Sequence, residues 1–195
     1  MKKMYKFSTL LLSVLTLGFM LTSCSSARKM AKKAPAGETP VQVYCSGPQY
    51  QSDTQAFRAN AIGESMDQAI SQKIALNNAR TNLASEMTVT LKGLLNNYAK
   101  QQVHNTDEEL EKNFQDLSQE VVDQQLVGTR TICEKVTKSD KGNYKTYIAI
   151  ELANDKVLSS LSNRLSQDTK LKIDYDYTKF KKEFEQAIQN QENNK

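Results

Sequence analysis

The sequence predicts an α+β protein: a small antiparallel sheet of about four strands, covered by several amphipathic helices and preceded by a signal peptide and a tether. The alternative is an elongated helical rod with a small β cap. Three observations lead to this prediction. All three prolines lie within the first 48 residues, so nothing in the rest of the chain removes a backbone donor from a long helix. A long stretch with small residues at helical spacing begins near residue 65. Two β-rich segments lie on either side of a polar loop near residue 140.

The N-terminus has the pattern of a bacterial lipoprotein leader. Three lysines precede an apolar run of about a dozen residues, which is too short to span a bilayer comfortably. The run ends in Leu21-Thr22-Ser23-Cys24, which resembles a lipobox, in which the cysteine is diacylated and the leader removed before it. We therefore predict a signal peptide over residues 1–23 and lipidation of Cys24, with diacylglycerol and palmitate as the attached lipids. The alternative is an ordinary secretory leader with an incidental cysteine.

Residues 24–40 are predicted to form a lipidated N-terminus and a flexible basic tether, because small residues and two prolines occur there without apolar periodicity. Four cations in this segment are candidates for contact with an anionic membrane surface: Arg28, Lys29, Lys32 and Lys33. The alternative is a run of charges that only keeps the tether soluble. The residues after the cysteine resemble neither an inner-membrane retention signal nor a surface-export signal. We therefore predict an outer-membrane protein facing the periplasm, with display on the cell surface as the alternative.

A single α+β domain is predicted over residues 41–190, followed by a polar tail over residues 191–195. Its first strand is predicted at residues 41–45, where polar and apolar residues alternate shortly before a Gly-Pro pair. The same alternation predicts a second strand at residues 57–62, leading into a turn at Gly63. The domain is thus expected to begin with two short strands.

The long helix that follows is the element around which we expect the domain to fold. Ser65 and Gln68 have the spacing of a capping box at its first turn. Small and apolar residues recur at helical spacing along one stripe: Ala75, Ala79, Leu83 and Met87. Alanines on such a stripe let a neighbouring element approach closely, so the stripe predicts a packing surface. A further helical stretch is predicted over residues 88–103, where Gly93 is a point of bending or interruption.

The second half of the domain is predicted to contain three more helices and a hairpin. Thr106 opens a second capping box and a helix with one apolar stripe. Residues 127–136 and 144–152 are rich in β-forming residues on either side of a glycine-containing loop, which predicts the hairpin. Asn154 is expected to cap the next helix, and a last helix is expected to begin near Asp176.

Three segments together carry a resemblance to a known family. They are Gly63-Glu64-Ser65, the helix with its alanines and Arg80 between Ala69 and Ala84, and the hairpin that ends in Tyr147-Ile-Ala-Ile-Glu-Leu152. In this order, and with the lipobox cysteine, they resemble the Lpp-twenty-like family of small bacterial outer-membrane lipoproteins, which is related to the N-terminal domain of a flagellar outer-ring assembly protein. The resemblance covers roughly residues 57–158. It implies an envelope lipoprotein with an α/β module and no assigned chemistry.

Residues that carry chemistry are sparse. His104 is the only histidine, and it lies at a predicted helix end. If Cys24 is lipidated, two cysteines remain, which are too few for a closed metal site of soft ligands. No local motif supports a Cys–His nucleophile pair, and the sequence contains no glycine-rich phosphate loop. We therefore predict a protein that is not an enzyme and that binds no metal or cofactor.

The charge balance argues against nucleic-acid binding. The formal net charge is +4, but three of the 26 basic residues belong to the predicted leader, which leaves 23 against 22 acidic residues. We expect the acylated N-terminus to bind membrane lipid and the body to engage another envelope protein or a cell-wall component. The leading prediction is a non-catalytic structural or interaction lipoprotein. The alternative is a surface-exposed adhesin or antigen.

Cys45 and Cys133 are the two thiols that remain if Cys24 is lipidated. Both lie on predicted strands, and the predicted compartment is oxidising. A disulfide between them would close a loop of roughly 88 residues and stabilise the fold by about 4–5 kcal/mol in the chain-entropy model. The alternative of two buried free thiols fits the sequence equally well.

Overall fold

The computed structural model describes residues 37, 39, 41–102, 108–167, 171 and 174–193. The chain divides into two units between Val41 and Gln42, and all helices and strands of the described residues belong to the second unit. The predicted signal peptide and several predicted site residues lie outside the described residues: Cys24, Arg28, Lys29, Lys32, Lys33, His104 and Thr106.

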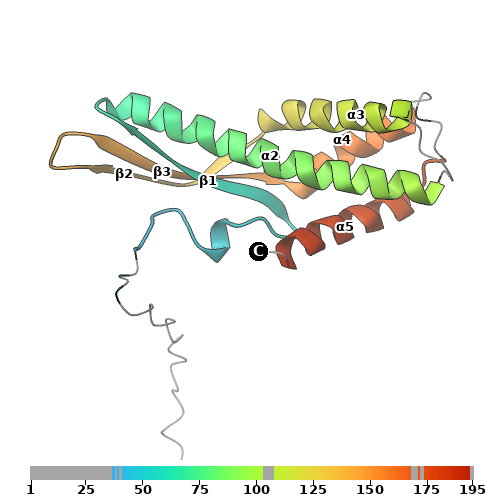
Figure 1. Ribbon diagram of the computed structural model, residues 1–195, viewed down its shortest axis with the longest axis horizontal. Coiled ribbons are helices and arrows are strands. Elements are labelled where there is room, and N and C mark those ends of the chain that lie inside the picture. Colours follow the sequence, from blue (N-terminus) through green and yellow to red (C-terminus); the bar gives the residue numbers. More distant parts are fainter. Residues whose placement is uncertain are drawn as a thin grey trace, which may run out of the picture. The chain divides into compact units, whose positions relative to one another are not determined.

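The second unit is α+β, which confirms the predicted class (Figure 1). Its strands are β1 (Ala56–Ser65), β2 (Arg130–Lys138) and β3 (Tyr144–Ala153). The α-helices of the described residues are α2 (Gln68–Gln102), α3 (Glu108–Leu126), α4 (Asn154–Gln167) and α5 (Tyr177–Asn193), and a short 3₁₀ turn, η1 (Pro48–Tyr50), precedes β1.

Strand β3 lies in the centre of the sheet, paired antiparallel with β1 on one side and β2 on the other. Strands β2 and β3 form the predicted hairpin. The predicted first strand at residues 41–45 is wrong, because these residues are not extended in a ladder, and the sheet of the described residues has three strands rather than four. Cys45 adopts a φ of 52°, a left-handed conformation that cannot continue a strand.

The prediction of a turn at Gly63 is also wrong. Gly63 lies inside β1, opposite Thr146 of β3. A Cβ atom at Gly63 would lie 2.3 Å from the backbone oxygen of Ser71 and 2.4 Å from the backbone nitrogen of Ala75, both in α2. Glycine is needed here because the backbones of the strand and the helix nearly touch. Beside this contact, the buried hydroxyls of Ser71 and Thr146 are hydrogen-bonded at 2.7 Å.

Helix α2 has 35 residues and runs through Gly93 without interruption. Its cap differs from the predicted one, because Asp67 rather than Ser65 accepts a backbone amide of the first turn, that of Ile70, at 2.9 Å. The reason is that β1 extends to Ser65, which is still paired with β3 and leaves Asp67 at the helix entrance. The Oγ of Ser65 instead accepts the amide of Asp67.

The buried stripe of α2 changes character along the helix. The predicted stripe is confirmed, because its members are fully buried: Ala75, Ala79, Leu83 and Met87. The first half of α2 lies along the sheet, and the second half lies beside α3 and α5 (Figure 1). There the buried side chains become large, and Leu91, Leu95 and Tyr98 pack with apolar residues of α3, α4 and α5 in one continuous core. One helix therefore joins the sheet to the helical part of the domain.

Side chains of α2 also cover part of the free edge of β1. Asn78 and Asn82 donate from their side-chain amides to the backbone carbonyls of Ile62 and Asn60, each at 3.1 Å. Because an uncovered edge strand can pair with another chain, such caps protect the edge.

Candidate functional site: a strap on the outer face of the sheet

Different parts of the chain pack against the two faces of the sheet. Residues of β1 with the same parity as Gly63, such as Phe57, point toward α2 and are buried or partly buried, as are their β3 partners such as Leu152. The opposite face, which we call the outer face, carries one row formed by Arg58, Glu151 and Arg130 from the three strands. Helix α2 leaves this outer face to other parts of the chain.

Residues 44–55, which we call the strap, attach to the outer face. The ring of Tyr44 packs edge-on against Tyr147 of β3, with ring centroids 5.4 Å apart. The next residue, Cys45, reaches β2, and the last residues of the strap contact Arg58 of β1. The first part of the domain after the predicted tether is therefore fastened to all three strands.

Cys45 and Cys133 lie at disulfide distance, which fits the predicted bridge. Their Sγ atoms are 2.13 Å apart and their Cα atoms 5.5 Å apart. Cys45 is buried, whereas Cys133 is partly exposed and follows a bulge in β2 at which Ile132 has no partner in β3. The bridge joins the beginning of the strap to a strand that lies 88 residues further along the chain.

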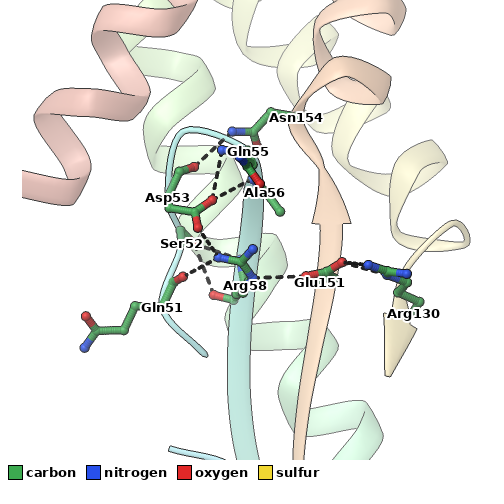
Figure 2. A network of polar contacts seen from close by, with 9 residues as sticks. All are labelled: Gln51, Ser52, Asp53, Gln55, Ala56, Arg58, Arg130, Glu151 and Asn154. Atoms are coloured by element: carbon green, nitrogen blue, oxygen red, sulfur yellow. Dashed lines mark hydrogen bonds and ion pairs between the residues drawn. The ribbon is translucent and has the colours of Figure 1, made fainter. Parts of the chain in front are cut away.

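A chain of four charged side chains holds the end of the strap (Figure 2). The Nε of Arg58 donates to Glu151 at 3.0 Å, and its Nη1 donates to Asp53 of the strap at 2.5 Å. Arg130 donates from its Nε to the other carboxylate oxygen of Glu151 at 2.6 Å. Because the charges alternate in sign, each is next to an opposite one, and we call these four residues the arginine network.

The arginine network also orders the backbone of the strap. Arg58 donates a second hydrogen bond from Nη1 to the carbonyl oxygen of Gln51 at 3.0 Å. The Oδ1 of Asp53 accepts the backbone amides of Gln55 and Ala56 at 2.9 and 3.0 Å. The strap therefore turns into β1 with its backbone groups paired.

Two uncharged side chains complete this attachment. The Oγ of the buried Ser52 accepts the amide of Arg58 at 2.8 Å and donates to its carbonyl at 3.2 Å, as a neighbouring strand would. Asn154, the first residue of α4, donates its backbone amide to Gln55 and its side-chain amide to the carbonyl of Asp53 (Figure 2). The strap is thus tied to α4 as well as to the sheet.

The pKa values in the arginine network follow from its pairing. Burial alone would raise the pKa of Asp53 and of Glu151, but hydrogen bonds from the arginines lower both below their usual values. Burial would lower the pKa of Arg58, whereas its bonds to the two carboxylates raise it. All these groups are therefore charged at neutral pH, and none is tuned to exchange a proton in catalysis.

The remaining surface of the described residues has fewer features of a candidate functional site. An open hollow of about 490 Å³ lies between α3 and α4 and is lined by polar side chains: Gln124, Gln125, Asp155, Lys156, Ser159, Ser160 and Asn163. Within the described ranges, no three His, Cys, Asp or Glu side chains come together as a metal site. Nor is any described helix both long and apolar enough to cross a membrane.

The chain matches no protein-family model, and no curated protein matches it. The resemblance to the Lpp-twenty-like family therefore stays a prediction from the sequence.

Of the residues in this site, only Cys45 and Cys133 stand out in the sequence. The arginine network does not, because Arg58 alternates with apolar residues and looks like any solvent-facing residue of a strand. Its partner Glu151 is 93 residues away. One signal was present: each ion has an apolar residue on either side of it in the sequence, and a charge that becomes buried in such surroundings needs a partner.

Proposed function

We propose that this protein is an envelope lipoprotein whose body is a non-catalytic structural or interaction module. In this proposal the lipid on Cys24 holds the protein in the outer membrane, and the body faces the periplasm, where it engages another envelope protein or a cell-wall component. The observation that carries the proposal is the lipobox pattern that ends at Cys24. Each buried acyl methylene contributes about 0.8 kcal/mol, so two or three acyl chains make such an anchor nearly permanent.

The attachment of the strap supports this proposal. A load on the N-terminal side of a folded domain acts first where the chain is fastened to the fold. In this chain the first fastening is covalent, between Cys45 and β2, and the second is the arginine network. The strap is therefore built to keep a tethered body folded. Asp53, Arg58 and Glu151 fit a structural role, because their shifted pKa values keep these three groups ionised and paired.

Replacing the lipidated sulfur tests the proposal. The Cys24→Ser variant should lose incorporation of labelled palmitate and retain its leader, whereas the neighbouring Ser25→Ala variant should be labelled and processed like the wild type. Globomycin, which blocks removal of lipoprotein leaders, should cause the wild-type precursor to accumulate. Equal palmitate labelling of the Cys24→Ser variant and the wild type would contradict the proposal.

The role of the body needs separate experiments. Crosslinking in intact cells should recover a covalent complex with another envelope component, and recovery of the uncrosslinked protein alone would argue against an interaction module. Protease added outside intact cells should leave the body intact if it faces the periplasm. Removal of the body under these conditions would favour the surface-exposed adhesin instead.

A further inference from the structure

The strap consists of two parts that are fastened in different ways. In its first part, residues 44–50, two side chains interact with the sheet: Tyr44 through one ring contact, and Cys45 through the bridge and through a contact of 3.5 Å between its Sγ and the carbonyl oxygen of Tyr147. The backbone of η1 also lies close to β1. The other hydrogen bonds described for this part are local: Ser46 donates to Val43, and the amide of Tyr50 donates to Gly47. The first part therefore depends on the bridge.

The second part of the strap, residues 51–55, does not depend on the bridge. Its carbonyls, amides and side chains are held by Arg58, by Asn154 and by the edge of β1. Beyond it, Gly63 and Ser71 seat the sheet on α2 through contacts on the opposite face. Loss of the bridge leaves all of these interactions in place.

The conformation of Cys45 favours release once the bridge is broken. Its φ of 52° lies in the left-handed region, which residues other than glycine, asparagine and aspartate rarely adopt. Once the bridge is broken, no covalent bond holds Cys45 in this conformation, and its thiol keeps only the long contact of 3.5 Å with the carbonyl oxygen of Tyr147. The single ring contact between Tyr44 and Tyr147 is exposed on one side, since Tyr44 is 49% exposed.

We propose that the Cys45–Cys133 bridge is a redox-operated clasp that sets where the N-terminal chain joins the body. In the oxidised state the chain joins at Cys45. After reduction it joins at Gln51, and the six released residues add up to about 20 Å of reach. Release of the strap does not require lipidation; only its effect on the distance between body and membrane rests on the proposed function.

The reductant in this proposal is a protein or small molecule with two thiols. One thiolate of the reductant attacks the Sγ of Cys133, which is partly exposed, and Cys45 leaves as a thiolate. The second thiol of the reductant then attacks the mixed disulfide, releases Cys133 as a thiolate and leaves the reductant oxidised. Two electrons pass to the protein, and the two thiolates take up protons from water according to their pKa values.

Limited proteolysis of the full-length chain tests the clasp, with dithiothreitol as the reductant. Chymotrypsin should cleave after Tyr50 at least ten times faster in the reduced chain than in the oxidised chain. Cleavage after Tyr177, which is 52% exposed and lies far from the strap in sequence, serves as an internal reference and should keep its rate. The double variant Cys45→Ser/Cys133→Ser should behave like the reduced chain without any reductant.

Each other outcome overturns the proposal in a different way. An unchanged rate after Tyr50 means that other contacts hold the first part of the strap. A faster rate after Tyr177 or within β1 and β3 means that the bridge holds the whole fold and is no clasp. The Cys24→Ser variant should release its strap as the wild type does, so failure of the clasp and failure of the lipid anchor give different results. A reductant that lacks its second thiol should be trapped on Cys133, and trapping on Cys45 would contradict the proposed order of attack.

Discussion

The two faces of the sheet are stabilised by different physics. On the α2 face, stability depends on close packing: the helix lies against the strand at Gly63, where there is no room for a Cβ atom. On the outer face, stability depends on the ion pairs of the arginine network and on the covalent bridge. The stability of the α2 face should therefore change when one methyl group is added and should not depend on pH. The outer face should respond to charge removal and pH.

The largest expected effect is that of Gly63→Ala. The added Cβ would meet the backbones of Ser71 and Ala75, which can yield only if helix and strand separate, so we expect a loss of about 3 kcal/mol or more in the free energy of unfolding. Chemical denaturation measures it. The matched control is Gly93→Ala in α2, where a Cβ meets no atom within 4 Å and the helix should gain up to about 1 kcal/mol. Equal midpoints for the two variants would contradict the close approach.

Among the charged residues of the outer face, removal of Arg58 should have the largest effect. Arg58→Ala leaves Asp53 without its arginine and leaves Glu151, which is 14% exposed, with only one cation, so we expect a loss of about 2–4 kcal/mol. Arg130→Ala is the control, because Arg130 is 75% exposed and its loss should cost less than about 1 kcal/mol. If both variants lost the same stability in urea titrations, the arginine network would not be centred on Arg58.

The pH dependence of stability should also separate the two faces. The pKa values of Asp53 and Glu151 are lowered in the folded state, so the unfolded chain binds more protons in acid. Their stabilisation is complete above the ordinary carboxyl pKa values of about 4 and is lost as the pH falls through the lowered ones. The free energy of unfolding should thus fall below about pH 5 in the wild type and fall less steeply in Arg58→Ala. Parallel curves for the two proteins, measured between neutral pH and pH 3, would speak against the network.

A smaller effect is expected for the hydroxyl pair beneath α2. Thr146→Val keeps the shape of the side chain but removes the partner of the Ser71 hydroxyl, which still donates to the carbonyl of Gln68. We expect a loss of about 1 kcal/mol, with no dependence on pH between 4 and 8. A double-mutant cycle with Ser71→Ala isolates the pair, and a coupling energy of zero would show that the hydrogen bond contributes nothing.

The local sequence pattern predicts the helices and strands of this fold better than it predicts which of them pair with one another. The buried stripe of α2 and the hairpin follow from periodicity, which each segment carries by itself. Residues 41–45 alternate as a strand does, but alternation does not reveal whether an edge is free to pair. In the fold, Ser52 and the side chains of Asn78 and Asn82 occupy the edge of β1.

For a related reason, the sequence alone could not predict the arginine network or the position of Gly63 inside a strand. Arg58 and Glu151 are identifiable only once the antiparallel register places them in one row. Gly63 has the sequence context of a turn, and only the docked helix shows that the strand continues through it. Asp67 caps the helix in place of Ser65 because Ser65 is still paired with β3 as the last residue of β1.

The asparagine caps on β1 have a consequence for crowded copies of the protein. An uncovered edge strand can pair with strands of neighbouring molecules, and such pairing can seed fibrils. Because the carbonyls of Asn60 and Ile62 already accept hydrogen bonds from side chains, an incoming strand would have to compete with two amides for these acceptors. At this edge of the sheet, part of the resistance to polymerisation therefore comes from α2, and substituting Asn78 and Asn82 should weaken it without changing any residue of the sheet.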